Sequence, residues 1–302
     1  MDEIVSIFMS PLRASALLLL TICFYIGLYL ILQALLPDEQ PLLEQLFIVL
    51  FIVTMARQVL DAFVIMQQIL GLFQHFFLLL LPLLTMMLYA VQAVFLLIAW
   101  HPILLVFIQF LLFVAEQAIL PMLVTTVVLD CCTRLLPAMS FAKASDFLRQ
   151  AVLSVMVVSS LTLTAALTFT GAAFFQLNEA VKSPIKKLIE QNIPLIGNLI
   201  VEGLSLFQKS QSAVVSIAGV AFLTAAWAVA FYPAVALLLH ALTFKLLGAL
   251  TEPLTNGRIS GLFDDISKTL FVLCAVALLL GFIIVFIVIL GVVILQFGVS
   301  KR

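Results

Sequence analysis

Two charged side chains interrupt long apolar stretches of this sequence, where a membrane protein places groups for ion coupling. Glu116 lies about halfway along the apolar run Pro102–Leu129, and Lys245 lies near the end of a later run. Burying a carboxylate at that depth costs about 2.5 kcal/mol or more, so we expect Glu116 to face protein, water or a cation rather than lipid. Lys245 can instead extend its ammonium group to the membrane interface. The two residues are candidate intramembrane functional groups that could pair, and a purely structural role is the alternative for each.

Motifs for enzymatic catalysis do not occur in the sequence. It contains no HExxH, no GxSxG, no glycine-rich phosphate loop and no DxxD-type metal cluster. The histidines His75, His101 and His240 are far apart in the chain, and the four cysteines have neither metal-ligand nor disulfide spacing. We therefore predict a protein that is not an enzyme, with no catalytic residues, no cofactor and no metal.

The composition indicates the class of fold. Of the 302 residues, 65% are hydrophobic and 10% are charged, whereas soluble domains have about 45–50% apolar and about 25% charged residues. The apolar runs are continuous rather than alternating, which excludes a β-barrel. A net charge of −1 argues against nucleic acid as a partner. The sequence therefore predicts an all-α, polytopic membrane protein in contact with lipid.

The first half of the chain contains several candidate membrane spans. Ala14–Leu36 is uncharged and long enough to cross a bilayer, and Gln45–Ala56 begins a second span that Arg57 and Asp61 interrupt. From Ala62 to Ala115 there is no formally charged residue. One helix of that length would measure about 80 Å against a hydrocarbon core of about 30 Å, so this run must fold back. The predicted corner is Trp100-His101-Pro102, with a further bend at Pro82.

The second half contributes the remaining spans, for a total of about seven (six to eight). The predicted spans are Pro102–Leu129, Phe147–Gly171, Ser210–Phe244 and Thr269–Phe297. Two polar connections, Asp130–Asp146 and Lys245–Lys268, are expected to separate them, the latter with an Asn256-Gly257 turn. Tyr232-Pro233 makes Ser210–Phe244 either a kinked span or two shorter helices. Small-residue faces at Ser160/Thr164/Thr168/Gly171 and Ala277/Gly281 could pack helices, within this chain or between subunits.

The segment Lys182–Ser212 differs from the rest. Apolar residues recur there at helical spacing opposite charged ones, which predicts a central amphipathic segment at the membrane interface rather than a crossing. Proline and glycine favour breaks and bends in helices. The candidate helix-break or interface residues are Pro102, Pro121, Pro194, Gly197, Pro233 and Pro253.

Residues 1–302 read as one integral membrane domain with a possible internal repeat. The putative copies are residues 57–171 and 182–291. Landmarks occur in the same order in both, among them Asp146-x-x-Arg149 and Asp265-x-x-Lys268, each of which opens an apolar span. If the number of crossings between the copies is odd, the repeats are inverted, as in many transporters.

Three stretches carry a resemblance to a known family. They are NIPLIGNLIVEGLSLFQKSQSAVVSIAG, FYPAVALLLHALTFKLLGALTEPL and GRISGLFDDISKTL, and HPILLVFIQFLLFVAEQAILPM adds to them. Over roughly residues 60–295 the chain resembles the stage III sporulation protein AE family. The N-terminal signal peptide and extracytoplasmic region usual in that family are not recognisable in this sequence. The family has no established catalytic residues to transfer to this chain.

The resemblance implies a role in endospore formation. It implies a permease-like subunit of the channel or secretion complex between mother cell and forespore, in the mother-cell membrane around the forespore. The implied partners are proteins of the same sporulation operon, including ring-forming components and a secretion-type ATPase, a partner on the forespore side, and further copies of this chain. The alternatives are a self-contained ion-coupled secondary transporter that uses Glu116 or Lys245, and a structural membrane scaffold.

Overall fold

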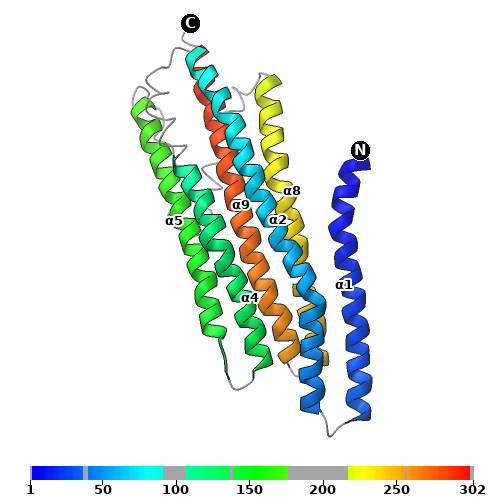
Figure 1. Ribbon diagram of the computed structural model, residues 1–302. Coiled ribbons are helices and arrows are strands. Elements are labelled where there is room, and N and C mark those ends of the chain that lie inside the picture. The colour runs from blue at the N-terminus through cyan, green and yellow to red at the C-terminus, as the bar shows by residue number, and fades with distance from the viewer. Residues whose placement is uncertain are drawn as a thin grey trace, which may run out of the picture. The chain divides into compact units, whose positions relative to one another are not determined.

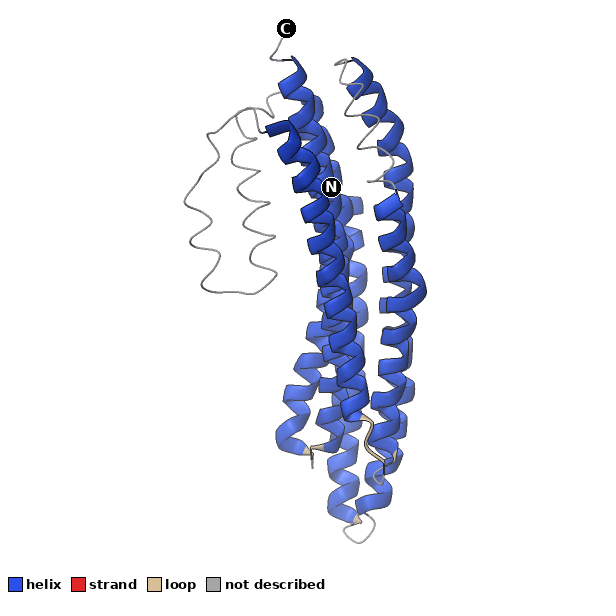
Figure 2. Ribbon diagram, turned by 90° about the vertical axis from the view of Figure 1, so that its left-hand side faces the viewer, coloured by secondary structure: helices blue, strands red, loops and turns tan. Residues whose placement is uncertain are grey.

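The structure is a computed structural model that describes residues 2–36, 40–90, 106–136, 139–175, 217–255 and 257–299. Every regular element within these ranges is helical (Figure 2). The long elements are α1 (Asp2–Leu35), α2 (Gln40–Ala90), α4 (Leu120–Leu135), α5 (Ala142–Phe175), α8 (Ile217–Thr251) and α9 (Arg258–Val299), labelled in Figure 1. The predicted all-α fold is therefore confirmed.

Six helices in the described part of the chain are long and apolar enough to cross a membrane. This number lies at the lower end of the six to eight predicted. The candidate spans are Ser15–Leu35, Gln40–Leu78, Val106–Leu135, Ala142–Thr162, Phe231–Thr251 and Arg258–Val285. The predicted span Ala14–Leu36 lies, apart from its last residue, within α1.

The predicted interruption at Arg57 and Asp61 is wrong, because α2 continues for 51 residues through both positions. Both side chains are exposed, while Gln58 between them is buried. A charged residue on the outward face leaves the backbone hydrogen bonds of a helix intact, so it does not end the helix. Helix α2 also continues through Pro82, where a bend was predicted.

The two predicted polar connections are shorter than expected. Helix α4 ends at Leu135 and α5 begins at Ala142, so most of Asp130–Asp146 is helical. Similarly, α8 ends at Thr251 and α9 begins at Arg258, with the 3₁₀ turn η4 (Glu252–Leu254) between them. The charged residues assigned to loops therefore lie on helices, where they bind one another.

Long-range contacts divide the chain into two compact units, each drawn from three separate stretches. Unit 1 comprises Met1–Leu70, Ala115–Leu153 and Phe231–Leu278, and unit 2 comprises Gly71–Val114, Ser154–Ala230 and Leu279–Arg302. The two units have different bounds from the two putative repeats. The internal repeat therefore stays a prediction. Every Asp, Glu, Lys and Arg within the ranges that the structure describes belongs to unit 1.

Aromatic side chains form much of the core of unit 1. Phe51 on α2 has no exposed surface, and its ring lies 6.1 Å from Phe47 and 5.5 Å from Phe263 on α9. Tyr29 on α1 meets Phe47 edge-on at 5.2 Å. Rings at such distances and tilts attract one another beyond simple burial. These contacts position α1, α2 and α9 around the polar groups described below.

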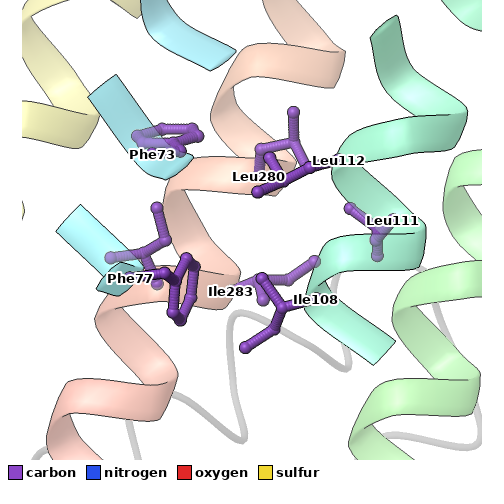
Figure 3. Close-up of a pocket in the computed structure, with 8 residues that line it drawn as sticks. Phe73, Phe77, Ile108, Leu111, Leu112, Leu280 and Ile283 are labelled. Carbon is purple, nitrogen blue, oxygen red and sulfur yellow. The ribbon is translucent and has the colours of Figure 1, made fainter. Parts of the chain in front are cut away.

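Unit 2 contains a small apolar cavity of about 10 Å³. Phe73 and Phe77 of α2 point toward Ile108 and toward Leu280 and Ile283 of α9 (Figure 3). Leu111, Leu112 and Ile284 complete the lining. A space of this size with no polar group in its lining is expected to stay dry.

The turn before α9 depends on a glycine. Gly257 has φ of +79°, a left-handed conformation that side chains with a Cβ atom rarely adopt. It lies next to Asn256, in the turn that the sequence predicted.

Replacing Gly257 with alanine should lower the free energy of unfolding by about 1–2 kcal/mol, because alanine is strained at this φ. Denaturant titration in detergent measures this loss. Gly27 on α1 is a suitable control, since a Cβ atom there would meet nothing within 4 Å. An equal loss in Gly27→Ala and Gly257→Ala would contradict the conformational explanation.

Several predicted features lie outside the described residues. They are the amphipathic segment Lys182–Ser212, the corner at Trp100-His101-Pro102, and the candidates Pro102, Pro194 and Gly197. Of the small-residue faces, Ser160, Ala277 and Gly281 are buried within the chain. Those three residues are therefore not available to a second subunit.

Candidate functional site

A network of charged side chains links α4, α5, α8 and α9 in unit 1. In the two pairs α4/α5 and α8/α9, the charged residues of the network lie within about three turns of the connection between the paired helices. The network contains four carboxylates and four cations, so its formal charge is zero. Its members are Asp130, Arg134, Asp146, Arg149, Lys245, Asp264, Asp265 and Lys268.

Arg149 on α5 is the centre of the network. Its guanidinium group donates to the carboxylates of Asp130 and Asp146, the latter at 2.6 Å. On α9 it donates to the Thr269 hydroxyl and to the backbone oxygen of Asp265, both at 3.0 Å. The side chains of Arg149 and Asp130 are only 7% and 2% exposed. All three nitrogens of Arg149 are therefore used to join α4, α5 and α9.

A second set of ion pairs surrounds Asp264 and Asp265 at the more exposed side. Arg134 on α4 binds the Asp265 carboxylate, and Lys268 lies 3.0 Å from both Asp264 and Asp265. Lys245 on α8 binds Asp264. Opposite charges attract, and the pairs of Arg134 and Lys245 join α4 and α8 to α9.

A glycine makes room for the Arg134 side chain. An ideal Cβ atom at Gly261 on α9 would lie 2.5 Å from the Arg134 guanidinium nitrogen. No side chain can be accommodated at that distance without moving Arg134. Gly261 therefore lets the guanidinium lie against the backbone of α9 and reach Asp265 one turn later.

A separate pair, Glu44 on α2 with Arg258 on α9, joins these helices at 3.5 Å. Glu44 is buried, and its Oε1 atom has no hydrogen-bond partner. This contact ties α2 to the start of α9.

Lys245 does not have the partner that the sequence suggested. We considered a pair between Lys245 and Glu116, whereas the structure joins Lys245 to Asp264. The Lys245 side chain is 56% exposed, as a residue near a helix end can be. Its carboxylate partner is 19 residues away on the next helix, beyond the turn.

Glu116 lies in an irregular part of its span. Residues Ala115–Ile119 form a π-helical turn, η2, directly before α4. Pro121 follows within the first two residues of α4. A proline lacks the N–H group and crowds the carbonyl four residues earlier, which a wider turn relieves. The helix therefore widens before Pro121 rather than breaking there.

The Glu116 side chain is exposed rather than packed in the interior of this chain. The expectation that Glu116 faces protein, water or a cation rather than lipid stays a prediction. Of the remaining proline candidates, Pro253 lies in η4 between α8 and α9. Pro233 is buried inside α8 and does not divide that helix in two. Proline is tolerated in membrane helices because neighbouring groups can satisfy the freed carbonyl.

The sequence alone did not identify the acidic and basic residues of the network as one site. A signal was present, because Asp146 and Arg149, and Asp265 and Lys268, are three residues apart and so share a helix face. These pairs were noted only as landmarks of a repeat. The contacts that join α4 and α5 to α9 are between residues more than 100 positions apart.

In a comparison with protein-family models, the stage III sporulation protein AE model matches residues 5–296. The match covers nearly the whole chain. The chain belongs to the stage III sporulation protein AE family. Comparisons with curated proteins and with solved structures gave no match.

Family membership connects this membrane protein to stage III of sporulation. The stage III sporulation protein AE match includes every described residue of the charged network and the π-helical turn at Glu116. Within the described part of the chain, no group of three or more His, Cys, Asp or Glu side chains is arranged to hold a metal ion. The charged side chains of the network are instead committed to one another.

Proposed function

We propose that this protein is a permease-like subunit of the complex that connects mother cell and forespore across their membranes during sporulation. Membership of the stage III sporulation protein AE family supports a role in sporulation. The six candidate membrane spans are consistent with a place within the membrane part of such a complex. On this proposal the protein lies in the mother-cell membrane and works with other proteins of the sporulation operon.

The observation that carries the proposal is the exposure of Glu116. The carboxylate is on the surface of a span whose mean hydropathy is 1.9. Ionisable side chains within membrane spans usually face the interior of a bundle or a water-filled cavity. The exposed position of Glu116 therefore suggests a surface that a neighbouring subunit or a water-filled path covers. The π-helical turn supports this idea, because such turns are frequent at functional sites.

The charged network supports an assembly subunit rather than a self-contained ion-coupled transporter. Lys245, the other candidate coupling residue, is bound to Asp264 in a balanced set of ion pairs. Such pairs fix the arrangement of α4, α5, α8 and α9 and leave a rigid surface for neighbours.

Photo-crosslinking in sporulating cells tests the proposal. A crosslinking amino acid at position 116 should capture a second copy of this chain or another operon protein. The same group at Leu17, an exposed apolar residue of α1, serves as the control. We expect position 116 to give protein adducts and Leu17 to give chiefly lipid adducts.

Purified protein in liposomes provides the complementary measurement. On the proposal, the protein alone shows no ion-coupled uptake of solutes, because the complex is incomplete. Coupled uptake that Glu116→Gln abolishes, together with only lipid adducts at position 116, would favour the self-contained transporter instead.

A further inference from the structure

Three buried polar side chains meet where α1, α2 and α8 come together in unit 1. They are Ser15 on α1, Gln58 on α2 and His240 on α8, which are 7%, 5% and 3% exposed. The Gln58 Nε2 atom lies 3.1 Å from His240 Nδ1 and 3.4 Å from Ser15 Oγ. The cluster is separate from the charged network, and the function proposed above makes no use of it.

The hydrogen bonds of this cluster define the state of His240. In the arrangement shown, the Gln58 amide group donates to His240 and to Ser15. His240 Nδ1 must then accept, so the imidazole is neutral and carries its proton on Nε2. The Gln58 Oε1 atom is buried and has no partner. An unsatisfied acceptor of this kind costs about 1–3 kcal/mol, so the cluster has an unused capacity to accept a hydrogen.

Turning the Gln58 amide over gives a second arrangement with the same three residues. Oε1 then accepts from Nδ1–H of His240 and from the Ser15 hydroxyl, which can donate as readily as it accepts. This second arrangement suits a ring with a proton on Nδ1, which is either the neutral Nδ1–H tautomer or the imidazolium ion, in which both ring nitrogens are donors. In either orientation one amide atom, Oε1 or Nε2, has no partner. The cost of an unpaired amide atom therefore does not favour one arrangement over the other.

A carboxylate is available to balance the charge of an imidazolium ion. Burial disfavours a charge on His240, and the Asp61 carboxylate, which follows Gln58 by three residues on α2, favours it. The Asp61 side chain is exposed, so it is in contact with the surroundings of the chain. On the other side of α8, Ser267 of α9 donates to the Ala241 carbonyl beside His240 at 3.2 Å and brings no charge. The nearest cation along α8, Lys245, is bound to Asp264.

We propose that His240, Gln58, Ser15 and Asp61 form a proton-binding site. One proton from water adds to the lone pair of His240 Nδ1, and the hydrogen bond from Gln58 Nε2 is replaced by one from Nδ1–H to Gln58 Oε1. The charge gained is balanced by the Asp61 carboxylate. The three helices stay joined in both states, but the bond between Gln58 and Ser15 changes direction. The site gives the protein a proton-linked state, and it does not depend on the proposed function.

Nitrogen-15 NMR of labelled histidine in the purified, detergent-solubilised chain tests the site. His75→Gln and His101→Gln leave His240 as the only imidazole in the sequence. The titration covers about pH 5 to 8, where a histidine can change charge. We expect the form with the proton on Nε2 at high pH and a doubly protonated ring at low pH. We expect Asp61→Asn and Gln58→Met to abolish this uptake within the range measured.

A second variant provides the matched control. His101→Gln with His240→Gln leaves only His75, an exposed histidine on the same helix as Gln58. Its titration should not respond to Asp61→Asn or to Gln58→Met. Circular dichroism checks that each variant is folded, and Asp61→Asn changes only an exposed side chain, so it tests the site even if Gln58→Met unfolds the protein.

Three results would overturn the proposal. The first is a His240 ring that stays neutral throughout the titration. The second is a ring whose proton is on Nδ1 at high pH. The third is proton uptake that Asp61→Asn leaves unchanged in the folded protein.

Discussion

Replacing Arg149 with methionine should lower the free energy of unfolding by about 3–5 kcal/mol, the largest effect that we expect from a single substitution. Methionine fills much of the space of the arginine but cannot donate to Asp130. The Asp130 carboxylate, 2% exposed, is then left buried without its cation. The bonds to Thr269 and to the Asp265 carbonyl are lost at the same time. Denaturant titration of the purified protein in mild detergent measures the change.

Two further variants show whether charge is the cause. Asp130→Asn combined with Arg149→Met removes both charges and should recover much of the stability, because no unpaired ion is left. Lys143→Met changes an exposed cation on the same helix and should alter stability by less than about 0.5 kcal/mol. If Arg149→Met and Lys143→Met have similar small effects, the buried pair does not stabilise this fold.

Replacing Gly261 with leucine should lower the free energy of unfolding by about 2–3 kcal/mol. The new side chain would occupy the place of the Arg134 guanidinium, which a Cβ atom already approaches to 2.5 Å. Arg134 must move away from Asp265, and a charged hydrogen-bonded pair of this kind contributes about 1.5–3 kcal/mol. Thermal unfolding in detergent would show the loss as a lower midpoint temperature.

A matched glycine and a double variant test this explanation. Gly71 on α2 has nothing within 4 Å of an added Cβ atom, so Gly71→Leu should be tolerated. With Arg134→Ala the space beside Gly261 is vacated, so adding Gly261→Leu should cost much less than it does alone. Strictly additive losses in the double variant would show that Gly261 and Arg134 do not compete for the same space.

Hydrophobicity along the chain was sufficient to predict an all-α fold with helices that can cross a membrane. The predicted span Ala14–Leu36 lies, apart from its last residue, within α1, because an uncharged run of that length has few alternatives to a helix in lipid. The turn at Gly257 was predictable for a similar reason, since Asn-Gly favours positive φ whatever surrounds it. These features depend on residues close together in the sequence.

The breaks between helices were harder to predict, because a charged residue or a proline can end a helix at one position and be accommodated within a helix at another. Arg57 and Asp61 were read as an interruption, yet both project from the surface of a continuous helix. Pro121, a candidate helix-break or interface residue, follows a π-helical turn. The sequence does not state which face of a helix the neighbouring helices cover, so it does not show whether a charged residue projects outward or interrupts the helix.

The sequence by itself determined that this is an all-α membrane protein of the stage III sporulation protein AE family. Only the tertiary structure decided what the charged residues do. Arg149 and the Asp265 carbonyl are 116 positions apart, and Gln58 and His240 are 182 positions apart. Ion pairs and hydrogen bonds act over a few ångströms, so such partners are defined by how the helices pack and not by their spacing along the chain.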